Sequence, residues 1–468
     1  MVHQNSDTCA PCAKDVGVKS NDLYIVYEHD DYVPCKKCRA TGARIHSEQW
    51  SDGLVYVDYG CSQDLKGGLG VRAPMHPVND IRGTQGSALR GKRIVLGITG
   101  SIAAVETVKL ARELARLGGE VIPVMTKAAV KIVHPDSVHF ATGLEPITEL
   151  DGAVKHVELC GESGSRADVL LIAPATANTI SKIACGIDDT PVTTMATCAL
   201  GSGMPVIIVP AMHASMYKHK IVNENIAKLR KLGVVFVGPR LEERKAKMAS
   251  QEDIVAEVCR AAGPWDLKGR RVLIIAGSTR EPIDDVRFIS NKSSGATGLA
   301  LAFEAYRRGA DVEAWVGFGI GTPPYVRAEI FGSVTDLEKM APKARADIVI
   351  VPAAISDFTV KPAKGKMPSK CRKTVSLEPA PKILGLLRKK GRRLVGFKAE
   401  TGISRKELEK RAGERMRQHG LDMIVANLLE NVGGDSTEAT ILRPGKKTAA
   451  FKGLKSALAE RIFDLLEA

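Results

Sequence analysis

The chain of 468 residues predicts an α/β protein made of two Rossmann-like domains with parallel sheets, preceded by a small cysteine-containing module. Two observations predict the paired domains. Apolar runs of strand length alternate with amphipathic helices, as they do when a parallel sheet is buried on both faces. The layout then occurs twice: residues 91–96 (GKRIVL) are echoed by 269–274 (GRRVLI), and residues 167–175 (ADVLLIAPA) by 346–354 (ADIVIVPAA). Ligands of such sheets bind in the loops after the matched strands.

Local sequence patterns predict the domain boundaries and the positions of helices and strands. A turn-rich stretch, residues 82–87 (RGTQGS), reads as a linker, so the predicted domains are residues 1–88, 89–263 and 264–468. A helix over residues 103–117 is amphipathic and ends at a glycine pair, with Arg112 and Arg116 near its negative end. The expected strands are Arg93–Ile98, Glu120–Met125, Val169–Ala173, Val206–Val209 and Arg271–Ala276.

The amino-acid composition limits the classes of function that the chain can have. The formal charge of +14 fits either a nucleic-acid-binding protein or a basic enzyme that handles anionic substrates. Aromatic residues make up only 4% of the chain, which is sparse for a base-stacking platform, so the enzyme is favoured. Apolar runs are too short to span a bilayer, and the N-terminus lacks a basic-then-apolar signal. We therefore expect a cytoplasmic protein.

Four of the ten cysteines have the spacing of a metal site. Two C-x2-C pairs form knuckles that can supply four thiolates to one tetrahedral metal, and they consist of Cys9, Cys12, Cys35 and Cys38. The pattern predicts a structural Zn²⁺ in a zinc-ribbon-like module. An iron centre and free thiols are the alternatives, and Cys61 and His46 are alternative ligands. Such modules bind nucleic acid or partner proteins, so its role stays open.

The second α/β domain carries the most specific motif. Residues 277–282 (GSTREP) follow an expected buried strand, and residues 291–295 (NKSSG) come shortly after. Small residues let backbone N–H groups approach phosphate oxygens, and Ser, Thr and Arg add donors. The segment resembles the AGxTREPxDxVRxISNxSSG stretch of phosphopantothenate–cysteine ligases, and the resemblance covers about residues 265–468. It implies that 4′-phosphopantothenate and a nucleoside triphosphate, CTP in the fused enzymes, form an acyl-nucleotide that cysteine attacks, with Mg²⁺ present.

The ligase resemblance assigns roles by position. It places the triphosphate at Gly277, Ser278 and Thr279, and the acyl-nucleotide at Arg287 and Asn291. Lys366 matches the first lysine of a mobile KxKK motif, although the lysines that follow it are displaced here. The remaining contacts implied for the nucleotide are Ala353, Asp357 (to Mg²⁺ or to the nucleotide itself), Phe397, Lys398 and Asn427.

Four motifs of the first α/β domain occur in the order found in flavin-containing cysteine decarboxylases. They are residues 97–104 (GITGSIAA), 155–159 (KHVEL), 174–179 (PATANT) and 210–217 (PAMHASMY). The resemblance covers about residues 90–260 and implies bound FMN and the substrate 4′-phosphopantothenoylcysteine. It makes His156 the catalytic histidine, and the implied FMN contacts are Gly100, Ser101, Thr126, Ala175, Thr176 and Asn178.

Two departures from the decarboxylase pattern matter. His213 stands where many members have an asparagine that holds the substrate carboxylate, which predicts the same role with a sharper acid-side pH dependence. The substrate flap, residues 240–248, has no cysteine to reprotonate the product. Lys245 or Lys247 is then the candidate acid, although a solvated charged loop is an equally simple interpretation. Cys160 and Cys185 are alternatives without an assigned place.

Together the two resemblances predict a bifunctional enzyme of coenzyme A synthesis, because the product of the ligase is the substrate of the decarboxylase. They also imply homo-oligomers, with trimers of the flavin domain and dimers of the ligase domain that can build a dodecamer. Two other functions compete. One is a zinc-ribbon nucleic-acid-binding or scaffold protein with nucleotide-binding domains, and the other is a flavin enzyme for a different substrate, such as a prenyl-flavin synthase.

Overall fold

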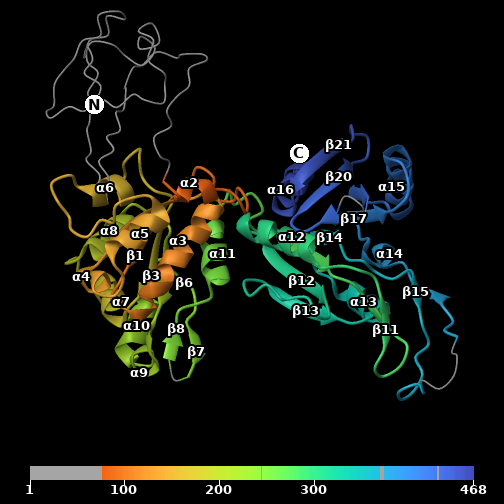
Figure 1. Cartoon of the computed structure of the whole chain (residues 1–468), viewed down its shortest axis with the longest axis horizontal. Helices are drawn as coiled ribbons and strands as arrows, with labels where there is room; N and C mark the ends of the chain where they lie inside the picture. The colour runs from red at the N-terminus through yellow and green to blue at the C-terminus, as the bar shows by residue number, and fades with distance from the viewer. Residues whose placement is uncertain (1–75, 244, 369–373, 429–431, 468) are drawn as a thin grey trace, which may run out of the picture. The chain divides into compact units, whose positions relative to one another are not determined.

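The computed structural model describes residues 76–243, 245–368, 374–428 and 432–467. Both predicted α/β domains belong to one unit, residues 77–468. Their elements are drawn in Figure 1. The predicted metal ligands Cys9, Cys12, Cys35 and Cys38 lie outside the described residues.

The first domain is a five-stranded parallel sheet in the order β2-β1-β3-β4-β6. This is the flavodoxin-like order, in which the chain reverses direction across the sheet between β1 and β3. The strands are β1 (Arg93–Ile98), β2 (Glu120–Met125), β3 (Val169–Ala175), β4 (Val206–Pro210) and β6 (Val235–Phe236). A separate three-stranded antiparallel sheet contains β5 (Met212–His213), β7 (Arg240–Glu242) and β8 (Lys245–Lys247).

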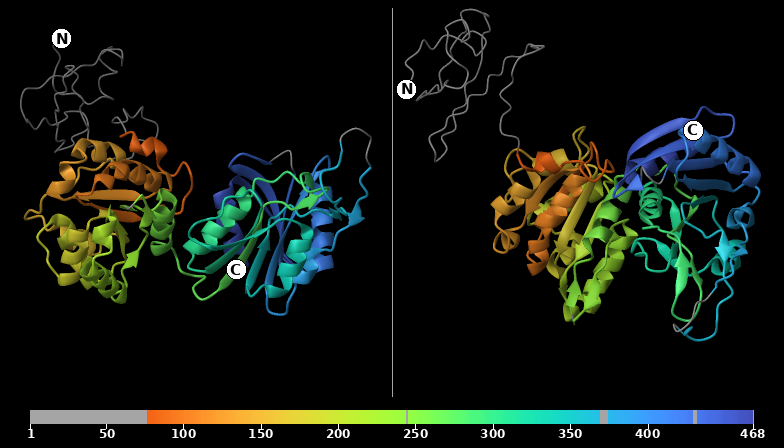
Figure 2. Two further views of the ribbon diagram at one scale, coloured as in Figure 1. Left: turned by 90° about the horizontal axis from the view of Figure 1, so that it is seen from below. Right: turned by 45° about the vertical axis from the view of Figure 1, so that its right-hand side comes forward.

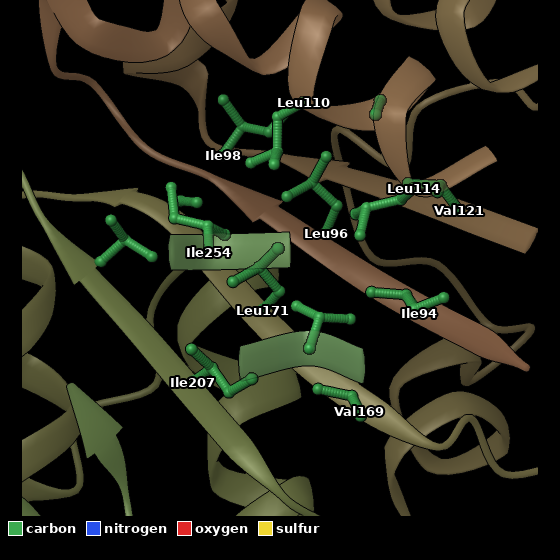
Figure 3. Packing of buried hydrophobic residues seen from close by; sticks show 14 of the residues in the cluster. Ile94, Leu96, Ile98, Leu110, Leu114, Val121, Val169, Leu171, Ile207 and Ile254 are labelled. Carbon is green, nitrogen blue, oxygen red and sulfur yellow. The ribbon is translucent and has the colours of Figure 1, made fainter. Parts of the chain in front are cut away.

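Helices cover both faces of the first sheet. Leu96 of β1 points to the face covered by α3, α5 and α11, and its neighbour Val95 points to the face covered by α7, α8 and α10. Figure 3 shows the first of these cores, where Leu110 and Leu114 pack on the strands. The helices are α2 (Val78–Ile81), η2 (Ile102–Glu106), α3 (Thr107–Arg116), α4 (Lys127–Val130), α5 (Pro135–Thr142), α6 (Lys155–Cys160), α7 (Ala177–Cys185), α8 (Pro191–Gly201), α9 (Ala214–Tyr217), α10 (Lys220–Lys231) and α11 (Gln251–Ala261).

The second domain has a larger mixed sheet. Its parallel part runs β13-β12-β9-β14-β17-β18, which is the 3-2-1-4-5-6 order of a dinucleotide-binding fold, and β20 continues it antiparallel. The strands are β9 (Arg271–Ala276), β12 (Asp311–Gly317), β13 (Arg327–Phe331), β14 (Ile348–Val351), β17 (Arg393–Glu400), β18 (Met423–Leu428), β19 (Val432–Gly433), β20 (Ser436–Leu442) and β21 (Ala449–Leu454). Two short ribbons lie outside it: β10 (Arg280–Pro282) with β11 (Phe288–Ser290), and β15 (Phe358–Thr359) with β16 (Glu378–Pro379).

Helices again cover both faces of this sheet, as the two views in Figure 2 show. Residues of α12 and α16 pack on one face, and residues of α13, α14 and α15 on the other. The helices are α12 (Ala296–Arg307), α13 (Val334–Met340), η3 (Ala341–Lys343), α14 (Ile383–Leu387), α15 (Arg405–His419) and α16 (Lys455–Glu467). The predicted doubly wound α/β architecture is therefore confirmed in the described part of the chain.

The strands β1, β2 and β9 have the bounds predicted from the sequence, but the helix predicted over residues 103–117 does not. It begins as the 3₁₀ segment η2 and becomes α-helical only at Thr107. The Thr107 hydroxyl donates to the carbonyl of Ala104, three residues back, and Ser101 caps the segment. Such 3₁₀ turns are common where a helix begins, and the periodicity of apolar residues does not reveal them.

A buried ion network fixes one end of α12. Glu304 accepts from Arg307 at 2.7 and 2.8 Å and from Arg308 at 2.7 Å, and its side chain is 6% exposed. Arg308 also pairs with Asp266 and Asp464. The arrangement satisfies two buried guanidinium groups that would be costly to bury alone.

Replacing Glu304 by alanine should lower the free energy of unfolding by about 3–5 kcal/mol, because both guanidinium groups would lose their shared carboxylate. Urea denaturation measures the loss. Glu409→Ala is the matched control, since its pair with Arg405 at 3.4 Å is exposed and should be worth less than about 1 kcal/mol. Equal losses for the two variants would show that the network does not stabilise the fold.

Candidate active sites

The first candidate site lies at the carboxyl ends of β1 and β3, where the first sheet reverses its winding. The Thr99 hydroxyl joins the two loops, since it donates to the carbonyl of Pro174 at 2.7 Å and accepts from the Thr176 N–H at 3.1 Å. Ser101 and Thr176 therefore flank the switch point. Gly100 has no room for a side chain, because a Cβ there would lie 2.5 Å from the Cβ of Ala128.

Three helical segments begin at this edge of the sheet, and each is capped by a residue predicted to contact FMN. Ser101, Thr126 and Thr176 accept hydrogen bonds from the N–H groups of Ala103, Ala129 and Thr179. Ala175 ends β3, and Asn178 lies in the first turn of α7. Backbone N–H groups at helix starts suit a phosphate, so the chemistry of this edge fits the phosphate end of FMN. The structure brings the six predicted FMN residues to three neighbouring strand ends.

A cavity of about 610 Å³ opens beside Ser101. It is lined by residues after β1, by residues 211–213 after β4, and by the hairpin formed by β7 and β8 with the start of α11. The hairpin is joined to β5 because β8 pairs antiparallel with it, with His213 opposite Lys245 and Met212 opposite Ala246. The predicted flap and the predicted carboxylate-binding histidine are therefore parts of one small sheet.

His213 presents a defined hydrogen-bonding face to this cavity. Its Nδ1 accepts from the Ser215 N–H at 3.3 Å and lies 2.8 Å from the Ser215 hydroxyl, so the residue caps the short helix α9. An Nδ1 that accepts leaves the ring proton on Nε2, an assignment that follows from the hydrogen bonds. The Nε2–H group is then the donor for a ligand.

Among the described residues, the three hairpin cations that line the cavity differ in their partners. Lys247 contacts Glu243 at 2.9 Å and Glu242 at 3.2 Å, and these hydrogen bonds raise the pKa of Lys247. Arg240 donates to the carbonyl of Met248 and lies 3.7 Å from Glu242. Lys245 makes no ion pair with a described carboxylate within 4.0 Å. Of the two predicted acids, Lys247 is held by carboxylates and Lys245 is not.

His156 stands apart from this cavity. It lies on α6, which is at a different end of the first domain from the β7–β8 hairpin in Figure 1, and it does not line the cavity. Its Nδ1 is buried and has no hydrogen-bond partner in the described structure. Val154 and Val157 beside it are 50% and 46% exposed. The structure therefore leaves His156 and His213 of one chain separate.

The second candidate site lies at the switch point between β9 and β14. The Ala354 N–H donates to the Gly277 carbonyl at 2.7 Å, and the Ser356 N–H donates to the Thr279 hydroxyl at 3.0 Å. Gly277 has φ of +92°, a conformation that favours glycine. Ser278 forms a bridge with Ala354 and accepts from the Ser290 hydroxyl at 3.1 Å. The predicted triphosphate loop and the segment containing Ala353 are thus held together.

Asp284 organises the residues predicted to act on the acyl-nucleotide. Its buried carboxylate accepts from the N–H groups of Val286 at 2.8 Å, Arg287 at 2.7 Å and Met367 at 3.1 Å. The Arg287 guanidinium donates to Asp284 at 3.0 Å and to the Met367 carbonyl at 3.3 Å. These backbone hydrogen bonds lower the pKa of Asp284. They bring Arg287 beside Lys366, which immediately precedes Met367.

Asn291 reaches the same loops from the end of β11. Its side-chain amide donates to the carbonyl of Ala354 at 3.3 Å, so it contacts the segment after β14. Ser293, Ser294 and Gly295 follow, and α12 begins at Ala296. The structure therefore places Asn291 at the switch point, and Asp284 joins Arg287 to the segment of Lys366.

A charged group borders the predicted nucleotide pocket. Asp357 accepts from Lys382 at 2.6 Å, and this hydrogen bond, with the charges of Arg415 and Lys398, lowers the pKa of Asp357. Lys398 is on β17 with Phe397 and pairs with Glu400 at 2.9 Å. Asn427 lies on the adjacent strand β18, opposite Ala399. Asp357, Phe397, Lys398 and Asn427 thus share the carboxyl edge of three neighbouring strands.

Sequence reasoning missed Arg415 and His419, which lie one turn apart on α15. The Arg415 Nε is buried without a hydrogen-bond partner in the described structure. Burial, with the charges of Arg415 and Lys382, lowers the pKa of His419 and so favours its neutral form. A cation whose carboxylate neighbours already have other partners suits an anionic ligand. The i, i+4 spacing on a charged helix was the only signal in the sequence.

No group of three or more His, Cys, Asp or Glu side chains within the described ranges is arranged to hold a metal ion. A Mg²⁺ bound mostly by nucleotide phosphates needs only one or two protein carboxylates, and Asp357 can supply one. Among the described helices, none is long and apolar enough to cross a membrane.

Comparisons with known proteins agree with this architecture. A family model described as "Flavoprotein" matches residues 82–263, and one described as "DNA/pantothenate metabolism flavoprotein C-terminal domain" matches residues 267–468. The coenzyme A biosynthesis bifunctional protein CoaBC of Thermococcus kodakarensis is 47% identical over 403 residues, 84% of this chain and 99% of that protein. Its Escherichia coli K12 counterpart is 34% identical over 365 residues, 73% of this chain and 87% of that protein.

Among solved structures, the C-terminal domain of a coenzyme A biosynthesis bifunctional protein CoaBC is 32% identical, with a TM-score of 0.36. The match covers 43% of this chain and 95% of that one. Relatives of full length thus match both α/β domains, in the order seen here. The chain belongs to the family of bifunctional coenzyme A biosynthesis proteins, in which a flavoprotein decarboxylase domain precedes a ligase domain.

Proposed function

We propose that the second domain joins 4′-phosphopantothenate to cysteine with CTP through an acyl-nucleotide, and that the first domain decarboxylates the resulting 4′-phosphopantothenoylcysteine to 4′-phosphopantetheine. The observation that carries the proposal is that Ser278, Thr279 and Asn291 join the loops after β9 and β14, while Asp284 holds Arg287 and the segment of Lys366 together. Donors that can bind phosphates thus lie where this fold binds nucleotides, and Arg287 and the segment of Lys366 share one anchor.

In the ligase domain, the loop of Gly277, Ser278 and Thr279 offers backbone N–H groups and hydroxyls to the triphosphate. Arg287 and Lys366 supply positive charge where negative charge develops as the acyl-nucleotide forms and breaks. Arg415 and Lys398 extend that positive charge toward the nucleotide, beside Asp357. Mg²⁺ held by the phosphates, with Asp357 as a protein contact, would neutralise the leaving pyrophosphate.

In the decarboxylase domain, the helix starts at Ser101, Thr126 and Thr176 would hold the FMN phosphate, with Gly100, Ala175 and Asn178 beside them. Bound FMN would supply a reversible two-electron oxidation of the cysteine unit, after which the carboxylate can leave as carbon dioxide. His213 binds that carboxylate through Nε2–H, and His156 moves a proton of the substrate. Lys245 is the candidate donor for reprotonation, because Lys247 is held by two glutamates.

Replacing His213 by asparagine should keep most decarboxylase activity and flatten its acid-side pH profile. Asparagine still donates to a carboxylate, but it cannot take up a proton, whereas protonation of the His213 Nδ1 would break its hydrogen bond with the Ser215 N–H. The measurement is kcat/KM for 4′-phosphopantothenoylcysteine between about pH 5 and pH 8. A variant with the profile of the unaltered enzyme would remove His213 from the site.

Assembly is part of the proposal. We infer a homo-oligomer, a trimer through the flavin domain and a dimer through the ligase domain, and hence a dodecamer. Large apolar side chains are exposed in both domains: Ile102 and Val157 in the first, and Val286 and Phe318 in the second, are 46–77% exposed. Exposed apolar side chains are common at contacts with further copies of a chain. A trimer would also let His156 of one copy approach the flavin site of the next.

Two further parts of the proposal concern the whole chain. We infer a cytoplasmic enzyme whose N-terminal cysteines, Cys9, Cys12, Cys35 and Cys38, bind a structural Zn²⁺. Metal analysis of the purified protein, alone and with each cysteine pair replaced by serine, tests the second point. One equivalent of zinc that is lost from both variants is expected.

The two halves are testable one at a time. The purified protein should absorb as a flavoprotein, and it should release carbon dioxide from synthetic 4′-phosphopantothenoylcysteine without any nucleotide. It should release pyrophosphate from CTP only when 4′-phosphopantothenate and Mg²⁺ are present. Colourless protein, or pyrophosphate release that does not depend on 4′-phosphopantothenate, would contradict the proposed activities.

A further inference from the structure

Among the described residues, Lys245 is a hairpin cation that has no carboxylate within 4.0 Å of its ammonium group. The three-stranded sheet of β5, β8 and β7 has His213, Lys245 and Glu242 in one row, since His213 is the Cα partner of Lys245 and Lys245 that of Glu242. Directly paired residues of antiparallel strands point to the same face, and their Cβ atoms lie about 4.5–5.5 Å apart. Lys245 and His213 are therefore side by side on one face.

The carboxylates near this row are already engaged. Glu242 contacts Lys247 at 3.2 Å and lies 3.7 Å from Arg240, and Glu243 contacts Lys247 at 2.9 Å. Lys245 is exposed and lines the same cavity as His213. The pair thus offers an Nε2–H donor and an ammonium group to one ligand, with no described carboxylate within 4.0 Å of the ammonium.

We propose that Lys245 and His213 together form the subsite for the carboxylate that the substrate will lose, with Lys245 as the charged member. This inference rests on the proposed decarboxylase activity. Two donors of different kinds can bind the two oxygens of one carboxylate, and the charged donor forms the stronger bond. The ion pairs of Lys247 with Glu242 and Glu243 connect the two strands of the hairpin. The role of Lys247 is therefore structural.

Two unreactive ligands distinguish carboxylate binding by Lys245 from a general effect of its replacement on the site. 4′-Phosphopantothenoylserine keeps the carboxylate but has no thiol to oxidise, and 4′-phosphopantetheine keeps the thiol but has no carboxylate. Inhibition constants for both are measured on the FMN-loaded full-length enzyme and on Lys245→Met. Loss of a charge-assisted hydrogen bond should weaken the serine compound by about 10- to 100-fold and leave 4′-phosphopantetheine within about twofold.

Lys247→Met is the matched control, because it removes a lysine of the same hairpin and should affect both ligands equally by loosening the strand pair. Lys245→Arg should recover most of the affinity for the serine compound. Equal weakening of both ligands in Lys245→Met, or selective loss in Lys247→Met, would overturn the assignment of Lys245. If the unaltered enzyme released no carbon dioxide from 4′-phosphopantothenoylcysteine, the proposed decarboxylase activity itself would fail, and this subsite with it.

Discussion

Replacement of Asp284 by asparagine will lower kcat/KM of the ligase by about 100-fold while the decarboxylase of the same molecule keeps its rate. An asparagine can place one carbonyl oxygen where the carboxylate now accepts three backbone N–H groups and a guanidinium. Its NH₂ group would lie opposite one of these N–H donors and could not accept a hydrogen bond from it. Arg287 and the segment that carries Lys366 would then lose their common anchor, and a displacement of about 1 Å is enough for a loss of this size.

Pyrophosphate release measures the ligase, and carbon dioxide release by the same preparation serves as the internal standard. Asp311→Asn, at an exposed position of β12, controls for the change of charge. Because the pKa of Asp284 is lowered, its carboxylate stays ionised at pH values below the ordinary range for Asp, and its contribution to stability is lost only as the pH falls through the lowered value. A full ligase rate in Asp284→Asn between pH 6 and pH 8 would show that Asp284 does not position the site.

Replacement of His156 by asparagine should reduce decarboxylation by about 10²- to 10⁴-fold, the range typical for removal of a general acid or base. The ligase rate and the flavin absorbance should not change, because His156 lies on α6 of the first domain and is not one of the predicted FMN contacts. The buried Nδ1 without a partner in the described structure is the local observation that favours a functional role. Stopped-flow absorbance of the bound flavin and carbon dioxide release measure the effect.

His219→Gln is the control for that substitution, because His219 is an exposed histidine of the same domain at the start of α10. A decarboxylase rate within about tenfold of the unaltered enzyme in His156→Asn would be too small a change for a general acid or base. Such a result would show that His156 contributes to packing and not to proton transfer. A colourless His156→Asn protein would instead place the residue in flavin binding.

The sequence predicted the parts of the fold that depend on local composition. Strands such as β1 and β9 are continuous apolar runs, and the site loops follow them directly, so their positions could be inferred. The order of the strands could not be inferred, because nothing in β1 or β3 states which strands are neighbours. The structure adds that the first sheet has the flavodoxin-like order and the second the 3-2-1-4-5-6 order.

The site residues can likewise be divided into those that the sequence predicted and those that only the structure shows. Motif residues such as Asn291 and Thr176 were predicted because the motifs that contain them resemble those of the ligase and decarboxylase families. Arg415 and His419 were missed because the sequence of a charged helix such as α15 is typical of a solvated surface. Only the packing of that helix brings Arg415 near Asp357 and His419 near Lys382. Lys245 and Lys247 could not be told apart either, since the register of β8 decides which one meets His213 and the turn decides which one meets Glu243.

The central claim is that one chain performs both steps in succession. The direct test is to incubate the purified protein with 4′-phosphopantothenate, cysteine, Mg²⁺ and either CTP or ATP, and to follow the products by mass spectrometry. We predict 4′-phosphopantetheine, formed faster with CTP, with 4′-phosphopantothenoylcysteine as a transient. Accumulation of 4′-phosphopantothenoylcysteine alone would contradict the decarboxylase assignment, and the absence of both products would contradict the account of both sites.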